Sequence, residues 1–155
     1  MEISNKHIHK ETVHEVLAHS YSIYFILLLV GVYLDFIFQF KIFSDSIMIP
    51  IGAGILILSS ALILWAQKTT RNLQKDIISK ETFCHGPYCY TRSPTHWGLF
   101  FLMLGFGIIM NAFFVILFTL VAFIISKFVF LKKEEKILTE KYGTPYLEYK
   151  KSVKF

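Results

Sequence analysis

Four long apolar runs dominate the sequence and limit the folds that it can adopt. They cover residues 21–40, 47–66, 97–110 and 112–131, and each carries few charged side chains. A helix needs roughly 20 apolar residues to cross the hydrocarbon core of a bilayer, because each residue adds about 1.5 Å. The third run is shorter than this length. The pattern predicts an all-α, polytopic membrane protein with four transmembrane helices, near residues 20–40, 46–66, 95–110 and 112–131.

The composition supports a membrane location and a single domain. Hydrophobic residues make up 54% of the 155-residue chain, more than an ordinary soluble domain of this size contains. The length fits one domain, which we place at residues 1–155. The net charge of +5 comes from basic residues beside the apolar runs. That position favours anionic lipid headgroups, so we expect the lipid bilayer and no nucleic acid as a partner.

Basic residues gather on one side of the predicted membrane domain. Four spans place the polar segment 67–92 on the same side as the C-terminal tail, and both segments are rich in Lys and Arg. On the opposite side, Lys41 is the single basic residue beside the predicted turns. Cytoplasmic segments carry such an excess of positive charge. We therefore predict a multi-pass integral membrane protein whose active face is cytoplasmic.

Three smaller features carry structural expectations. Residues 8–17 form a weakly amphipathic stretch, which is a candidate for a short interfacial helix. Asp35 lies near the end of the first run, where an interfacial position is favoured over a role in proton transfer. Cys84 and Cys89 are the two cysteines, too few for a disulfide framework, so we expect free thiols in a reducing compartment.

Two polar clusters converge if the last two spans form a hairpin. They cover residues 86–98 and 134–149 and combine aromatic rings, a guanidinium and two carboxylates. Such a pocket suits S-adenosylmethionine. An aromatic face such as that of Tyr88 attracts its sulfonium. Glu134 or Glu135 can hold its ammonium, and Arg92 can bind its carboxylate.

Four short motifs resemble one enzyme family. The chain has GPY at 86–88, RSPTHWG at 92–98, EEKIL at 134–138 and YGTPYLEY at 142–149. In this order and spacing they resemble the isoprenylcysteine carboxyl methyltransferase and phospholipid methyltransferase family. The resemblance covers about half the chain. It implies methyl transfer from S-adenosylmethionine to an amphiphilic acceptor at the membrane interface, either a lipid headgroup or an isoprenylcysteine-like carboxylate.

The resemblance also implies roles for particular residues. The candidate catalytic residues are Arg92 and His96, and we expect no metal. The candidate cofactor-binding residues are Lys80, Glu81, Thr82, Phe83, Tyr88, Ser93, Pro94, His96 and Glu134.

Two departures from the family pattern bear on the acceptor. Ser93 replaces the usual His after the Arg, and His96 replaces the usual Tyr, which indicates a different selectivity. Phe130 stands where isoprenylcysteine enzymes carry a substrate-contacting Arg, four residues before the first Glu. Three nearby lysines are candidates to replace that Arg: Lys127, Lys132 and Lys133.

Other interpretations of the same residues stay open. The Glu134–Glu135 pair can be an ordinary solvated helix face, and the tyrosines of the tail can be interface anchors. Cys84, His85, Cys89 and His96 are a weaker candidate for a zinc site, because their spacing is unusual for zinc. Alternative functions are an NADPH-dependent enzyme similar to membrane sterol reductases, and a non-enzymatic four-helix membrane protein.

Overall fold

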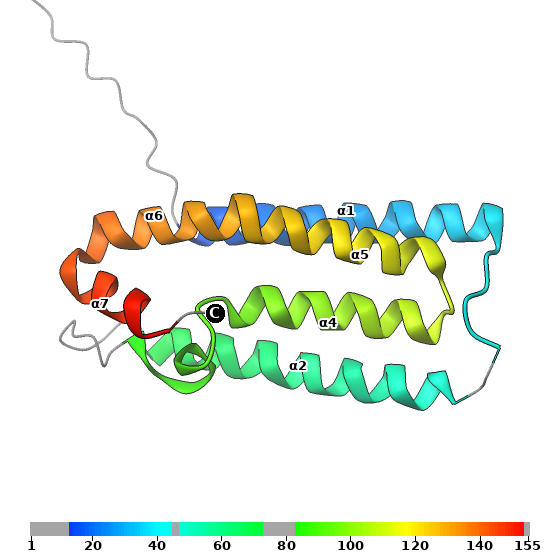
Figure 1. The fold of residues 1–155 in the computed structure, drawn as a ribbon, viewed down its shortest axis with the longest axis horizontal. Helices are drawn as coiled ribbons and strands as arrows, with labels where there is room; N and C mark the ends of the chain where they lie inside the picture. The colour runs from blue at the N-terminus through cyan, green and yellow to red at the C-terminus, as the bar shows by residue number, and fades with distance from the viewer. Residues whose placement is uncertain (1–12, 45–46, 73–82, 154–155) are drawn as a thin grey trace, which may run out of the picture.

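Helices account for most of the chain that the computed structural model describes, which comprises residues 13–44, 47–72 and 83–153. Those ranges contain no strand, and the longer helices lie side by side along one long axis (Figure 1). The elements in chain order are α1 (Val13–Phe38), α2 (Met48–Asn72), the 3₁₀ turn η1 (Gly86–Cys89), α4 (Pro94–Ile109), α5 (Phe113–Ile125), the π-helical segment η2 (Ser126–Phe130), α6 (Leu131–Tyr142) and α7 (Thr144–Ser152).

Three of the described helices are long and apolar enough to cross a membrane. They are Val13–Phe38, Met48–Thr70 within α2, and Phe113–Tyr142, the continuous rod of α5, η2 and α6. Helix α4 is apolar but has 16 residues. Its length is about 24 Å, which is shorter than the roughly 30 Å of a bilayer core.

Helix boundaries correct two sequence-based expectations. Residues 13–17 are the first turns of α1 rather than a separate interfacial helix, because the helical hydrogen bonding continues without a break into the apolar run. The rest of that predicted helix, residues 8–12, lies outside the described residues. Helix α2 continues to Asn72, so the start of the predicted polar loop is helical. The stop at Gly143 is confirmed, with a positive φ of 62° that a glycine adopts at little cost.

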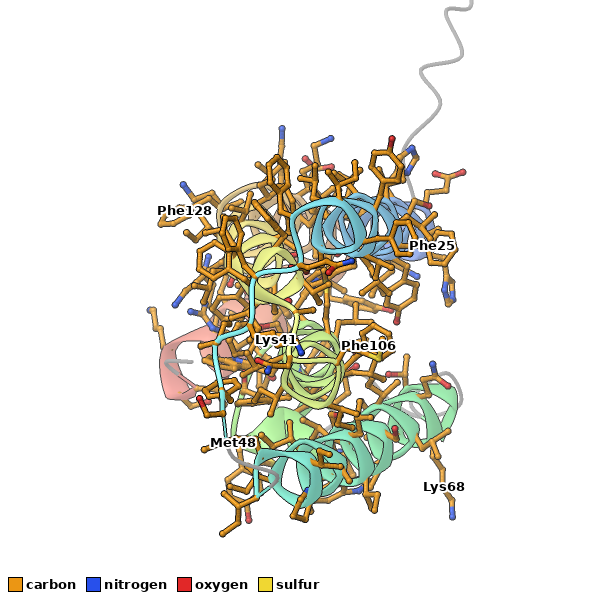
Figure 2. The ribbon with its side chains drawn as sticks, turned by 90° about the vertical axis from the view of Figure 1, so that its right-hand side faces the viewer. Phe25, Lys41, Met48, Lys68, Phe106 and Phe128 are labelled. Carbon is orange, nitrogen blue, oxygen red and sulfur yellow. A yellow bond between two sulfur atoms is a disulfide. The ribbon has the colours of Figure 1, made fainter. Side chains whose placement is uncertain are left out.

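The helices present apolar side chains to their surroundings. Phe25 and Phe128 point outward on opposite sides of the bundle (Figure 2), and each is more than half exposed. Phe36, Leu58 and Ile57 are more than two-thirds exposed. In water such a surface would promote aggregation, whereas hydrocarbon solvates it at no cost. The outside of the bundle therefore fits an integral membrane protein.

Helix packing follows the order α2, α4, α5, α1 across the bundle. The central contacts between α1, α4 and α5 bury Tyr24, Met103, Val115 and Ala122. Between α2 and α4 the backbones approach closely at two glycines. A Cβ added to Gly105 would lie 2.9 Å from the carbonyl oxygen of Gly52 and 3.1 Å from the amide nitrogen of Leu56. Small residues at this contact replace the side-chain layer that separates most helices.

At the end of the bundle away from α7, two polar side chains, Asp35 and Asn111, hydrogen-bond to neighbouring segments. The Asp35 carboxylate accepts the backbone N–H groups of Phe114 and Val115, at 3.1 and 3.0 Å. It thus caps the N-terminus of α5 from a different helix. Asn111, the predicted turn residue, has a positive φ of 52° and accepts the N–H groups of Ile42 and Phe43 at 2.9 Å. These bonds hold the α1–α2 connection and the α4–α5 connection together at that end.

We predict that Gly105→Ala destabilises the protein by about 1–3 kcal/mol, the range for overpacking a close contact. Backbone atoms of α2 lie in the way, so the added methyl can be accommodated only by separating the two helices. Reversible unfolding in mixed detergent micelles measures the change. Gly54→Ala in the same helix pair is the matched control, because a Cβ there meets nothing within 4 Å. Equal stability of the two variants would contradict the close contact.

Candidate functional site

Polar groups from four helices meet at the end of the bundle that carries α7. The first turn of α4, the start of α1, the segment η2 and the helix α6 all lie there (Figure 1). Pro94 begins α4, and its missing N–H costs nothing at a position where no intrahelical bond is made. The first turn thereby brings Arg92, Ser93 and His96 to the junction between the polar loop and the apolar helix.

His96 is the centre of a buried hydrogen-bonded chain. Its side chain is almost fully buried, with a residue exposure of 3%. The ring Nε2 lies 3.0 Å from Oε1 of Glu134, and Nδ1 lies 3.3 Å from Oγ of Ser20. Ser20 Oγ in turn lies 3.3 Å from Oγ of Ser126. An ionised carboxylate only accepts hydrogen bonds, so Nε2–H donates to Glu134.

The π-helical segment η2 helps Ser126 and Glu134, the two ends of this hydrogen-bonded chain, to face the same interior region. Ser126 and Glu134 are eight residues apart, and in an unbroken α-helix their directions would differ by about 80°. A π-helical turn holds more residues than an α-helical turn, which reduces this difference. Both side chains are buried and both belong to the same chain of hydrogen bonds. Such bulges are frequent at functional sites.

A second ionic group borders the first. Arg92 Nη1 donates to Oε1 of Glu135 at 2.7 Å, and Lys150 Nζ lies 2.7 Å from the other oxygen, Oε2. The Arg92 and Glu135 side chains are mostly buried, with exposures of 18% and 13%. Glu134 and Glu135 therefore both face the interior with different partners, and neither is a solvated surface residue.

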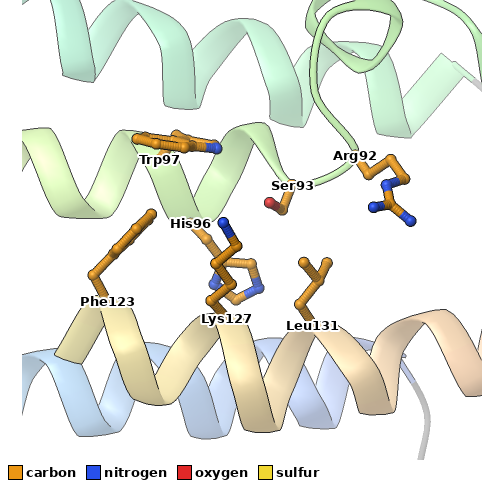
Figure 3. A pocket seen from close by; sticks show the side chains of 7 residues that line it. All are labelled: Arg92, Ser93, His96, Trp97, Phe123, Lys127 and Leu131. Atoms are coloured by element: carbon orange, nitrogen blue, oxygen red, sulfur yellow. The ribbon is translucent and has the colours of Figure 1, made fainter. Parts of the chain in front are cut away.

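A small cavity opens between α4 and the α5–η2–α6 rod (Figure 3). Its volume is about 50 Å³, enough for a few water molecules or a charged end group. Polar groups and aromatic rings share its wall, which consists of Arg92, Ser93, His96, Trp97, Phe123, Lys127 and Leu131. The Trp97 and Phe123 rings lie 4.8 Å apart and close one side of it. Within the described residues Lys127 has no acidic partner, so it leaves a positive charge at the cavity.

The other candidate lysines and Phe130 lie elsewhere. Phe130 is buried, and it does not line the cavity. The Lys132 ammonium lies over the ring of Phe128, 5.6 Å from its centre, on the outer surface. Of the three lysines considered as replacements for the family arginine, Lys127 is the one that reaches the cavity.

An aromatic cluster of the tail supports the loop before α4. It consists of Phe83, Leu138, Tyr142, Tyr146, Tyr149 and Val153. The Tyr149 hydroxyl donates to the carbonyl oxygen of Tyr88 at 2.7 Å. Burial raises the pKa values of Tyr146 and Tyr149 above the ordinary value for tyrosine, and the Glu135 carboxylate adds to the effect at Tyr146. Both phenols stay protonated at neutral pH and remain hydrogen-bond donors.

The two cysteines form a disulfide across η1, so the expectation of free thiols was wrong. The 3₁₀ turn folds the chain back on itself and leaves the Cα atoms of Cys84 and Cys89 4.5 Å apart. This separation lies within the range that a disulfide bridges. The same bond occupies both sulfur atoms that the zinc alternative would require.

The structure brings part of the predicted site together. Arg92, Ser93 and His96 line the cavity, and Pro94 is buried beside them. Glu134 reaches the site through His96. Phe83 packs in the tail cluster, while the Tyr88 hydroxyl pairs with Thr70 of α2 at 3.0 Å, so neither lines the cavity. Lys80, Glu81 and Thr82 lie outside the described residues.

Three residues at the site escaped the sequence analysis: Ser20, Ser126 and Phe123. Ser126 and Phe123 lie inside an apolar run and Ser20 directly before one, where a small hydroxyl or one more phenylalanine carries no motif. The two serines had one weak signal, since a polar side chain inside an apolar helix needs a partner. The sequence could not name that partner.

The comparisons with known proteins agree with this picture. No curated protein and no solved structure matched the chain. The sequence model of the phospholipid methyltransferase family matches residues 47–145, from the start of α2 to the start of α7. This region holds the cavity, the first three motifs and the start of the fourth, but not α1. Since the match covers more than half of the sequence, the chain belongs to the phospholipid methyltransferase family.

Proposed function

We propose that this protein is a membrane enzyme that transfers a methyl group from S-adenosylmethionine to an amphiphilic acceptor taken from the bilayer. The observation that carries the proposal is the convergence of Arg92, His96 and Glu134 beside an aromatic wall, where the polar loop becomes an apolar helix. Membership of a methyltransferase family supports the reaction class.

The residues at the cavity fit the charged end of this methyl donor. Glu134 uses Oε1 for His96, and Oε2 has no partner within the described chain. That oxygen can accept from an ammonium, and the Arg92 guanidinium at the cavity wall complements a carboxylate. The aromatic rings of Trp97 and Phe123 suit a neighbouring sulfonium. The volume of about 50 Å³ admits an end group rather than a nucleoside, and we assign the remainder of the donor to the motif residues 80–83 and Tyr88.

The protein's part in this chemistry is alignment and exclusion of water. S-adenosylmethionine supplies a methyl group on a positively charged sulfur, and the acceptor supplies the electron pair. Arg92 and Glu134 orient the donor, while Trp97 and Phe123 keep water from the reacting end. His96 holds the Glu134 carboxylate in place through Nε2. None of these residues needs to form a covalent bond.

The lipid side of the cavity suits an acceptor with an apolar tail. Trp97 and Phe123 belong to a larger aromatic group with Phe100 and Phe101, with ring centres 4.6 to 6.2 Å apart. A tail can pack along these rings while the headgroup reaches Lys127, whose positive charge would attract a phosphate or carboxylate. The short helix α4 thins the protein at this place, which supports lateral entry.

We further propose four spans, with α4 as the third, and a cytoplasmic site. Helix α4 packs between α2 and the α5–η2–α6 rod, both of which are long enough to span. The site end carries most of the basic residues, and the other end has Lys41.

Labelling of introduced cysteines tests this topology. In a background with Cys84→Ser and Cys89→Ser, we expect Ser152→Cys to react with an impermeant maleimide from the cytoplasmic side. Ser44→Cys, in the connection between α1 and α2, is expected to react from the opposite side. Reaction of both positions from one side would rule out the proposed topology.

Calorimetry with S-adenosylhomocysteine tests the donor. We expect the purified protein to bind it, and Glu134→Gln to weaken binding by roughly 1.5–3 kcal/mol, the value of a hydrogen bond to a charged group. Glutamine keeps an oxygen for His96, so the loss reports the charge. Glu148→Gln is the control on an exposed residue of α7. Equal losses in Glu134→Gln and Glu135→Gln would indicate a general charge effect, and binding of NADPH alone would favour the reductase alternative.

A series of acceptors with one amine headgroup and tails of increasing length tests the entry route. Methyl transfer in nanodiscs is expected to rise with tail length, because each buried CH₂ adds about 0.8 kcal/mol to membrane partitioning. Turnover should also follow the surface concentration of acceptor rather than its bulk concentration. An equally fast reaction of a short, freely soluble analogue would contradict entry from the lipid.

A further inference from the structure

Helix α1 lies outside the region that the family model matches, yet it contributes to the site. That match begins at residue 47, whereas Ser20 of α1 contacts His96 of α4. Ser20 has no exposed surface. Its hydroxyl does not bond back to its own helix, in contrast to that of Ser22, which donates to the carbonyl oxygen of Ala18 at 2.9 Å. The buried hydroxyl is instead directed across the bundle, to His96 and Ser126.

We propose that Ser20 is a positioning residue for the reaction. When Nε2–H donates to Glu134, Nδ1 of a neutral imidazole is an acceptor, and the Ser20 hydroxyl at 3.3 Å is placed to donate to it. With the Ser20 proton used in this way, the Ser126 hydroxyl of the π-helical segment, 3.3 Å from Ser20 Oγ, is the donor to Ser20. The imidazole is thus held from both sides, in one tautomer and one orientation.

The orientation of the His96 ring affects the proposed donor site through Glu134. The oxygen Oε1 of this carboxylate is bound to His96, so the ring orientation sets where Oε2 lies. Without the Ser20 hydroxyl, Nδ1 would be a buried acceptor that lacks this hydrogen bond. Turning the ring toward another donor would then lower the free energy. Both hydroxyl contacts are 3.3 Å, long for this type of bond, and such contacts often tighten when substrate binds. Ser20 therefore acts on methyl transfer through His96 and Glu134 without touching the reactants.

Two readouts test the assignment, and the activity readout rests on the proposed function. The first is methyl transfer from radiolabelled S-adenosylmethionine to an aminophospholipid in nanodiscs. Ser20→Ala is expected to lower kcat by about ten- to a hundredfold, the loss expected when a reacting group is misplaced. KM for the lipid should stay unchanged, because Ser20 does not reach the cavity. Ser22→Ala, two residues along on the exposed face of the same helix, should keep the activity of the parent protein.

The second readout is the ¹⁵N resonance of His96 Nδ1 in protein labelled at histidine, which requires no turnover. We expect Ser20→Ala to shift this resonance and Ser22→Ala to leave it in place, with Ser20→Thr restoring both resonance and rate. An unchanged resonance and rate in Ser20→Ala, or equal losses in Ser20→Ala and Ser22→Ala, would overturn the inference. If the parent protein bound S-adenosylhomocysteine but did not methylate the lipid, the proposed acceptor would fail, and the Nδ1 resonance alone would decide the role of Ser20.

Discussion

The buried contact between His96 and Glu134 organises the polar end of this molecule. It joins the first turn of α4 to α6, which are 38 residues apart in sequence. A buried carboxylate is costly unless a donor compensates it, and a buried imidazole is stable only when its nitrogens find partners. Here the imidazole and the carboxylate are hydrogen-bond partners of each other. The contact also ties the family-matched region to α1, since the remaining ring nitrogen takes its bond from Ser20.

Helix length determines that this contact sits at the edge of the apolar region. The α5–η2–α6 rod has 30 residues and extends about 45 Å, well beyond a hydrocarbon core of roughly 30 Å. Its surplus is the polar helix α6 with Glu134 and Glu135. Helix α4 has 16 residues and begins at the same level. The long α5–η2–α6 rod beside the short helix α4 thus places polar side chains directly next to the apolar part of the bundle. Such a place suits a charged donor and a lipid together.

The charges at this polar end are arranged in two groups rather than one. Glu135 is shared between Arg92 and Lys150, and this network anchors the tail helix α7 to the loop before α4. Glu134 binds His96 through Oε1. Adjacent acids on one helix point about 100° apart, which allows one to support the structure while the other is available to a ligand. Lys127 adds a cation without an acidic partner among the described residues, at the cavity that the rings of Trp97 and Phe123 also line.

The sequence by itself determined the helical class, the membrane location and the family. Apolar runs of bilayer length have one stable backbone solution in hydrocarbon, and the motifs around Arg92 and Glu134 have a specific order. Only the tertiary structure decided which side chains meet. Ser20, His96, Ser126 and Glu134 come from helices that are distant in sequence, and a π-helical segment alters the register between the last two. Periodicity describes which face a residue has within one helix, whereas partners across helices depend on packing and relative height. For the same reason the Cys84–Cys89 bond was missed, because the 3₁₀ turn that closes it leaves no periodic signal.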